Sequence, residues 1–114
     1  MPQIHVNANG RVGLFYFDTE NATAAQPGLT DTFIASCDST TRDCSNPASW
    51  ASGGETRLST SGSFDYTTAA NAGGLLLGDH QGLTSAGSRF IALVDISKPF
   101  ATTGRSDTFS NTAS

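Results

Sequence analysis

Residues 75–95 read LLLGDHQGLTSAGSRFIALVD, and they are the part of the sequence that says most about the fold, because two apolar runs are joined through the polar segment GDHQG. Neither a helix nor a simple hairpin requires a connection of this kind. The second apolar run, at residues 89–96, has the length and composition of a β-strand. The stretch therefore predicts two strands separated by an irregular connection.

Short apolar runs of the same kind recur along the chain, at residues 4–6, 11–17, 32–36, 56–59 and 74–77. In the run RVGLFYF, residues 11–17, both alternating faces are apolar, so we expect this strand to be covered on both sides. No window of roughly ten or more residues combines a helical period with capping residues. We therefore predict an all-β chain with antiparallel strands.

Composition limits the functions open to the chain. Its 114 residues suit a single domain spanning residues 1–114, and seven Phe with patterned apolar runs predict a folded chain. Six Lys and Arg against ten Asp and Glu give a net charge of −4, which lacks the basic face that nucleic-acid binding requires. No run reaches the ~18 apolar residues of a transmembrane helix, so we expect no membrane partner. Residues 1–5 lack the features of a signal peptide.

Two pairs of segments repeat within the chain at nearly the same spacing. NGRVGLFYFDT at residues 9–19 matches GSRFIALVDIS at residues 87–97, which pairs Arg11 with Arg89. Each of the two strands ends in an aspartate, Asp18 or Asp95, so the spacing is 77 or 78 residues. DTF at residues 31–33 matches DTF at residues 107–109. Such a repeat predicts two copies of one antiparallel unit, the second of them incomplete. The two units span about residues 3–60 and 64–110.

These segments resemble the blades of the BNR or Asp-box repeat family, the sialidase-like six-bladed β-propellers, over about residues 4–109. The most specific match is GDHQGL at residues 78–83, which resembles the GDYxGL segment of that family, with His80 where Tyr is common. The resemblance implies about one and a half to two antiparallel blade-type sheets, with GDHQG turning the chain at a corner near the central channel. A small β-sandwich of two blades packed on each other is the alternative.

The two cysteines, Cys37 and Cys44, flank a short polar segment at an expected hairpin. If the flanking strands pair, the Cα atoms come within the ~4.4–6.8 Å that a disulfide needs. Two free thiols in a cytosolic chain are the alternative. SCDS at residues 36–39 matches the first half of the family's Asp box, but the glycine and the correctly spaced tryptophan of the box are missing.

Five residues are candidates for contact with a ligand. The resemblance implies that Asp79 and His80 lie at the channel corner. There Asp79 either accepts hydrogen bonds from backbone amides or binds a ligand. Tyr66, with Asp65 beside it, is the best-placed polar aromatic residue on a loop, and Trp50 offers a further aromatic contact. No His or Cys cluster has metal-ligand spacing, and no arginine or tyrosine lies in a recognisable catalytic motif. We therefore predict no metal, no cofactor and no catalytic residue.

Three functions from different classes follow. The resemblance implies a non-catalytic propeller module that binds carbohydrate. The alternatives are a fragment of an exo-sialidase-type glycoside hydrolase, inactive in isolation, and an orphan structural or protein-interaction domain. Because two blades cannot close a six-bladed propeller, we expect either a remainder of a longer propeller or a homo-oligomer, with a cyclic trimer as the simplest closed form. The resemblance also implies a secreted or extracytoplasmic protein.

Overall fold

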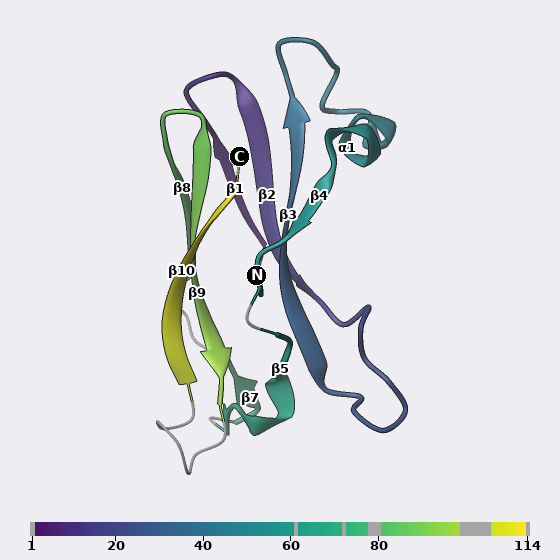
Figure 1. The fold of residues 1–114 in the computed structure, drawn as a ribbon, viewed down its shortest axis with the longest axis vertical. Helices are drawn as coiled ribbons and strands as arrows, with labels where there is room; N and C mark the ends of the chain where they lie inside the picture. Colours follow the sequence, from purple (N-terminus) through teal and green to yellow (C-terminus); the bar gives the residue numbers. More distant parts are fainter. Residues whose placement is uncertain (1, 61, 72, 78–80, 99–105, 114) are drawn as a thin grey trace.

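The structure of the chain is a computed structural model that describes residues 2–60, 62–71, 73–77, 81–98 and 106–113. The prediction of antiparallel β-structure is confirmed, since two antiparallel sheets pack face to face (Figure 1). The described strands form neither a closed sheet nor a propeller. One short helix makes the chain mostly rather than wholly β.

The first sheet has the strand order β1-β2-β3-β4, and β5 pairs with β3 beyond β4. Its strands are β1 (Gln3–Val6), β2 (Arg11–Asp18), β3 (Leu29–Asp38), β4 (Glu55–Arg57) and β5 (Phe64–Asp65). The first four include or overlap the apolar runs seen in the sequence. On β2 and β3 these runs are explained by the side chains that are buried against the second sheet.

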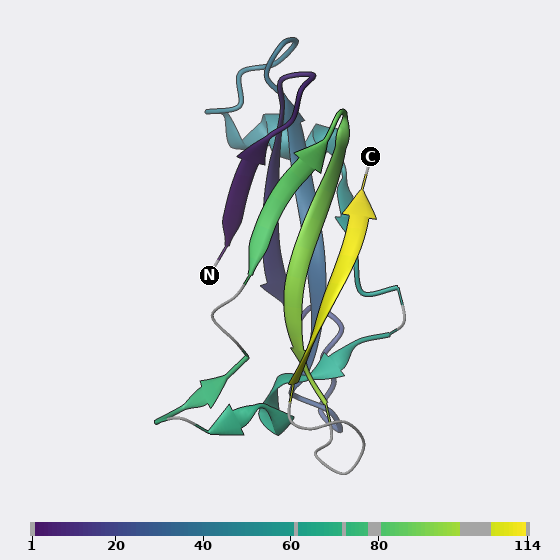
Figure 2. The ribbon, with the colours of Figure 1, turned by 90° about the vertical axis from the view of Figure 1, so that its left-hand side faces the viewer.

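The second sheet is a three-stranded meander with the order β10-β9-β8. Its strands are β8 (Gly82–Ala86), β9 (Arg89–Ser97) and β10 (Ser106–Ala113), and a separate ribbon pairs β6 (Ala70–Asn71) with β7 (Leu75–Leu76). Strand β8 is not apparent from the sequence, because GLTSA contains a single large apolar residue. In Figure 2, β1 and β8 lie on one side of the molecule and β10 on the other.

Helix α1 (Pro47–Gly53) is the element that departs from the all-β prediction. At its start the Asn46 side chain accepts a hydrogen bond from the Ala48 amide at 3.0 Å, and proline occupies the first turn. Gly54, with a φ of +85°, ends the helix. Seven residues are too few for an apolar period to stand out in the sequence. A single-turn 3-10 helix, η1 (Tyr66–Thr68), follows β5.

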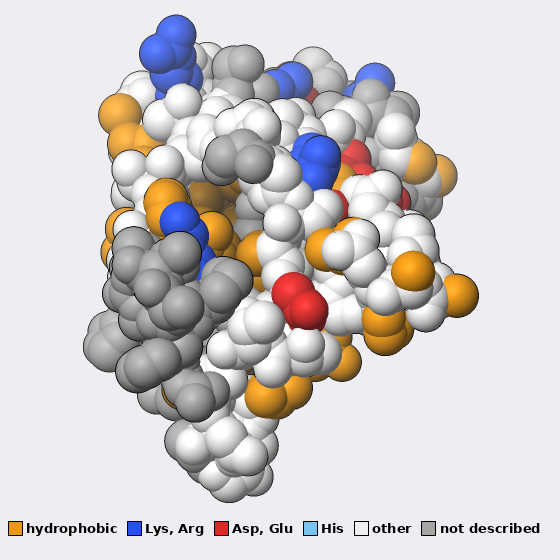
Figure 3. Space-filling view, turned by 60° about the horizontal axis from the view of Figure 1, so that its bottom comes forward, with side chains coloured by type: hydrophobic (Ala, Val, Ile, Leu, Met, Phe, Trp, Pro, Cys, Tyr) orange, Lys and Arg blue, Asp and Glu red, His pale blue; other side chains and the backbone are white. Residues whose placement is uncertain are grey.

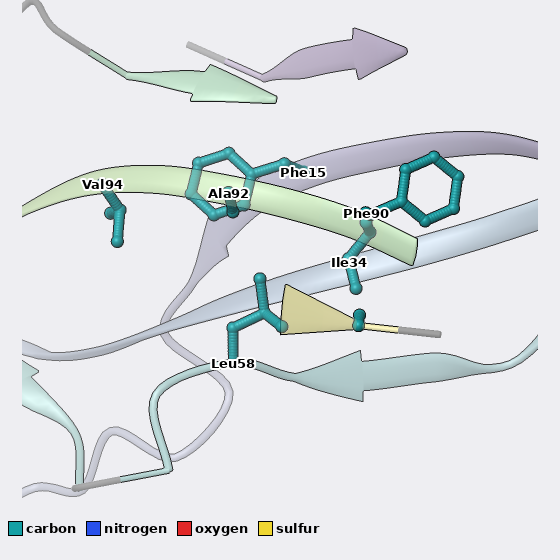
Figure 4. Close-up of a cluster of buried hydrophobic side chains, with 7 residues drawn as sticks. Phe15, Ile34, Leu58, Phe90, Ala92 and Val94 are labelled. Carbon is teal, nitrogen blue, oxygen red and sulfur yellow. The ribbon is translucent and has the colours of Figure 1, made fainter. Parts of the chain in front are cut away.

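An apolar core lies between the two sheets. Its buried members are Phe15, Ile34, Leu58, Phe90, Ala92, Val94 and Ala113 (Figure 4). Gly13 allows a close approach of β2 to β9, because a Cβ atom there would lie 2.7 Å from the Phe90 ring. A large side chain on one sheet therefore fits against a position without a side chain on the other.

The two faces of β2 have different surroundings. Gly13 and Phe15 are buried against the second sheet, whereas Leu14 and Tyr16, on the opposite face, are half-buried. On that outer face, α1 contacts β3 and leaves β1 and β2 without a covering sheet in the described part of the chain. The expected covering on both sides is therefore complete on one face of β2 only.

The strand registers reproduce the repeat seen in the sequence. Strands β2 and β9 begin with the two matched arginines, and β3 and β10 contain the two DTF segments. In this alignment the pair Tyr16 and Phe33 corresponds to the pair Val94 and Phe109. Both pairs are cross-strand neighbours. The central and third strands of the two meanders are therefore equivalent residue by residue.

Candidate functional site

A groove opens between the two sheets at the end of the molecule that faces the viewer in Figure 3, where apolar side chains line a hollow. It consists of two adjoining hollows of about 430 and 300 Å³ that share Gly62, Ile96 and Phe109. We call it the inter-sheet groove, and the rest of its lining is Leu29, Thr32, Leu58, Ser59, Thr60, Ser63, Phe64, Asp65, Thr68, Val94, Ser97, Lys98, Ser110 and Asn111. Hydroxyl groups therefore surround an apolar base.

The inter-sheet groove lies where the second sheet has no fourth strand among the described residues. In the first sheet, β3 pairs with β2 on one edge and with β4 and β5 on the other. Within the described ranges, the equivalent strand β10 pairs with β9 alone. It contributes Phe109, Ser110 and Asn111 to the groove, and Asn111 Nδ2 donates a hydrogen bond to the carbonyl of Leu58 on the facing wall.

An exposed aromatic ring lies where the two hollows meet. Phe109 is 37% exposed, and Lys98 Nζ lies 4.7 Å from the centre of its ring. This distance is within the range of a cation–π interaction. The inter-sheet groove therefore presents an aromatic surface with a positive charge beside it.

Asp65 forms one corner of the groove and also shapes it. Its Oδ1 accepts hydrogen bonds from the Thr67 amide at 2.9 Å and from Thr67 Oγ1 at 2.6 Å, which caps η1. Gly28 makes room for this carboxylate, since a Cβ atom on Gly28 would lie 2.2 Å from Asp65 Oδ1. The Asp65 backbone carbonyl accepts from Ser97 Oγ at 2.5 Å and so ties this corner to β9.

A buried carboxylate anchors the groove wall that follows β4. Asp31 is fully buried and accepts hydrogen bonds from Arg57 Nη2 and Ser59 Oγ at 2.6 Å and from Ser63 Oγ at 3.0 Å. Asn21 Nδ2 donates a fourth at 2.7 Å. Burial raises the pKa of Asp31, but these hydrogen bonds outweigh it and hold the pKa below its usual value. The charged carboxylate therefore fixes two groove residues, Ser59 and Ser63.

Trp50 lies at the opposite end of the long axis, in α1 (Figure 1). Its Nε1 donates to the Cys44 carbonyl at 2.9 Å, so the indole holds the neighbouring loop. Trp50 lines a separate hollow of about 360 Å³ together with Tyr16 and Glu55. The Tyr16 hydroxyl donates a hydrogen bond to Glu55. Burial, followed by this hydrogen bond, raises the pKa of Tyr16, which makes its phenol harder to ionise than that of an ordinary tyrosine.

Three of the five predicted ligand contacts lie in the described part of the chain, and the structure does not bring these three together. Asp65 lines the inter-sheet groove, and Tyr66 is half-buried in η1 beside it without lining the groove. Trp50 belongs to the hollow at the other end. Asp79 and His80 lie outside the described residues, so the channel corner stays a prediction.

Cys37 and Cys44 form the predicted disulfide, with Cα atoms 5.9 Å apart, but not across a hairpin: Cys37 lies in β3 and Cys44 in the loop that leads to α1. The bridge closes the loop between β3 and α1, where Asp38 Oδ1 accepts hydrogen bonds from the Thr40 amide at 3.0 Å and from Thr40 Oγ1 at 2.6 Å. A disulfide is consistent with an oxidising, extracytoplasmic location.

The described part of the chain does not form a metal site. Its residues contain no group of three or more His, Cys, Asp or Glu side chains placed to hold a metal ion. His5 Nε2 instead forms a hydrogen bond with Ser85 Oγ at 3.0 Å and joins β1 to β8. None of the helices formed by the described residues has the length and apolar character needed to cross a membrane.

Comparison of the chain with protein-family models, curated proteins and solved structures finds no match. The site therefore has to be interpreted from its own geometry. Lys98 and Phe109 are absent from the residues that the sequence singles out as ligand contacts. The repeated DTF segment places Phe109 near the start of a strand, but only the register of β10 on β9 brings its ring under Lys98.

Proposed function

We propose that the chain is a non-catalytic carbohydrate-binding module whose ligand lies in the inter-sheet groove. The observation that carries this proposal is the ring of Phe109, exposed in a groove lined by hydroxyl, amide and charged side chains. A sugar ring has an apolar face suited to an aromatic side chain and hydroxyl groups suited to the polar lining. The ammonium group of Lys98 favours an acidic sugar.

For the fold, the proposal is that the two meanders are blade-like units related to the sialidase-like β-propellers. The matching registers of β2–β3 and β9–β10 support a structural repeat, and the GDHQGL segment at residues 78–83 supports the resemblance. Such units complete a propeller either within a longer chain or by association of several copies. The disulfide supports a secreted or extracytoplasmic location.

A fragment of an exo-sialidase-type hydrolase is the second candidate, because the resemblance implies a tyrosine nucleophile activated by a glutamate. Tyr16 and Glu55 form such a pair. However, the raised pKa of Tyr16 disfavours the phenolate that attack would need. Hydrolysis of a fluorogenic sialoside that is lost in Tyr16→Phe would favour the enzyme over the binding module.

The direct test is a glycan array probed with the chain and with Phe109→Ala. Leu75→Ala is the matched control, since Leu75 is also a large, exposed apolar residue but lies outside the inter-sheet groove. We expect binding of at least one glycan class, weakened about tenfold or more by Phe109→Ala and unchanged by Leu75→Ala. No binding to any glycan, or equal loss in both variants, would contradict the proposal and favour the orphan interaction domain.

A further inference from the structure

Three of the large exposed apolar side chains lie on the faces of the sheets that point away from the core. Ile4 and Val6, 66% and 54% exposed, pair with Leu14 and Val12 on the outer face of the first sheet. Leu93, 44% exposed, alternates with buried core residues of β9 and so lies on the outer face of the second sheet. Each sheet therefore has an apolar outer face with no covering sheet among the described residues.

The repeat relates these outer faces to faces that are already in contact. With β2 and β9 aligned on their first arginines, Val12 and Leu14 on the outer face of β2 correspond to Phe90 and Ala92, which are core residues of the second sheet. Conversely, Gly13 and Phe15 in the core correspond to Ile91 and Leu93 on the outer face of β9. Equivalent units thus meet through opposite faces, which is a head-to-tail contact.

We propose that the outer face of the first sheet binds the outer face of the second sheet in another copy of this chain. This contact repeats the one between the two sheets of a single chain. Within the chain, Gly13 packs against the Phe90 ring. Because Ile91 is the equivalent of Gly13 and Val12 is the equivalent of Phe90, Ile91 of one copy contacts Val12 of the other. By the same equivalence, Leu93 of one copy faces Leu14 of the other.

The neighbouring strands fit the same contact. Within the chain β1 lies beside β8, joined by the hydrogen bond between His5 and Ser85. The equivalent contact between copies places Ile4 and Val6 of one copy against β8 of the next. Among the described residues, helix α1 packs chiefly on β3, and no sheet covers β1 on this outer face. After each contact, the copy at either end of the assembly still has one free outer face. Further copies therefore add until a ring closes or a filament forms.

The test is light scattering behind size exclusion on the chain and on three arginine variants. Ile4→Arg blocks the outer face of the first sheet, and Leu93→Arg blocks that of the second. Both positions are exposed, so the fold should survive, which far-ultraviolet circular dichroism checks. Ala24→Arg, at an exposed position in the loop between β2 and β3, is the matched control, since Ala24 belongs to neither sheet.

We expect the chain and Ala24→Arg to assemble, and each blocked variant to weaken association about tenfold or more because a charge is buried in an apolar contact. An equimolar mixture of Ile4→Arg and Leu93→Arg should form a one-to-one dimer of two 11.8 kDa chains, since each supplies the face that the other lacks. A wild-type monomer at high concentration would overturn the proposal. So would assembly of either blocked variant alone, or a mixture that stays monomeric.

Discussion

Strands β3 and β10 hold the same place in the two sheets, yet their surroundings differ. Eight residues of β3 have neighbours in β2, and its other edge is covered by β4 and β5. β10 pairs with β9 alone in the described part of the chain, and most of its described side chains are exposed. The inter-sheet groove lies beside this uncovered edge. The candidate site thus lies beside a strand edge that has no partner among the described residues.

The two sheets also differ in what stabilises them. The first sheet has a buried carboxylate network around Asp31, the Cys37–Cys44 disulfide and helix α1. The second sheet contributes Phe90, Ala92 and Val94 to the core. We therefore expect its stability to depend chiefly on packing against the first sheet.

The largest effect should come from breaking the buried carboxylate network of the first sheet. Asp31→Asn removes the charge that Arg57, Ser59 and Ser63 share, and it leaves buried donors without an acceptor of equal strength. We expect the free energy of unfolding to fall by about 3 kcal/mol. Urea denaturation followed by circular dichroism measures it. Glu20→Gln, an exposed carboxylate change, should stay within about 0.5 kcal/mol, and an equal loss in both variants would refute the role of the network.

The next effect should come from removing the covalent link of the first sheet. The double variant Cys37→Ala and Cys44→Ala opens a loop with a sequence separation of 7 and should lower the free energy of unfolding by about 2 kcal/mol. Because the Trp50 indole donates to the Cys44 carbonyl, its fluorescence should shift as well. Unchanged stability on reduction of the wild-type chain would show that α1 alone holds this loop.

A smaller effect should follow from disturbing the packing between the sheets. Gly13→Ala places a methyl group against the Phe90 ring and should cost about 1–2 kcal/mol. Phe90→Leu in the same chain should recover part of this cost, which a double-mutant cycle measures. Gly82→Ala is the matched control, because a Cβ atom there meets no atom within 4 Å. Equal effects at the two glycines would contradict the close approach of β2 to β9.

The smallest effect should be on how the free energy of unfolding depends on pH in the acidic range. The pKa of folded Asp31 lies below the usual 3.8, so the unfolded chain binds a proton more readily in this range. Its contribution is therefore complete above about pH 4 and is lost as the pH falls through the folded pKa. Denaturation midpoints between pH 6 and about pH 3 should fall less steeply in Asp31→Asn. Identical slopes would show that other carboxylates carry the acid sensitivity.

Much of the fold can be predicted from the sequence because apolar alternation controls which strands are buried. The runs on β2 and β9 and the repeated DTF segments on β3 and β10 predict the central and third strands of both meanders. Strand β8 and helix α1 escape such a prediction, since GLTSA has weak alternation and α1 depends on a local cap at Asn46. The conformation of both elements depends on contacts made in the folded chain rather than on a pattern of apolar residues.

The candidate site is less predictable for a physical reason. Asp65 is visible in the sequence as an acidic residue beside an aromatic one, and it does line the inter-sheet groove. Phe109 and Lys98 become neighbours only when β10 pairs with β9. The partners of Asp31 come from Asn21 to Ser63, and no spacing in the sequence links them.

A titration of the ¹⁵N-labelled chain with the glycan that gives the strongest array signal tests whether the inter-sheet groove is a carbohydrate site. Amide chemical shifts should change at Gly62, Ser110 and Asn111, which line the groove, while the Trp50 indole signal stays in place. Shifts confined to Trp50 and Glu55, or no shifts at a saturating glycan concentration, would contradict the assignment of the groove as the binding site.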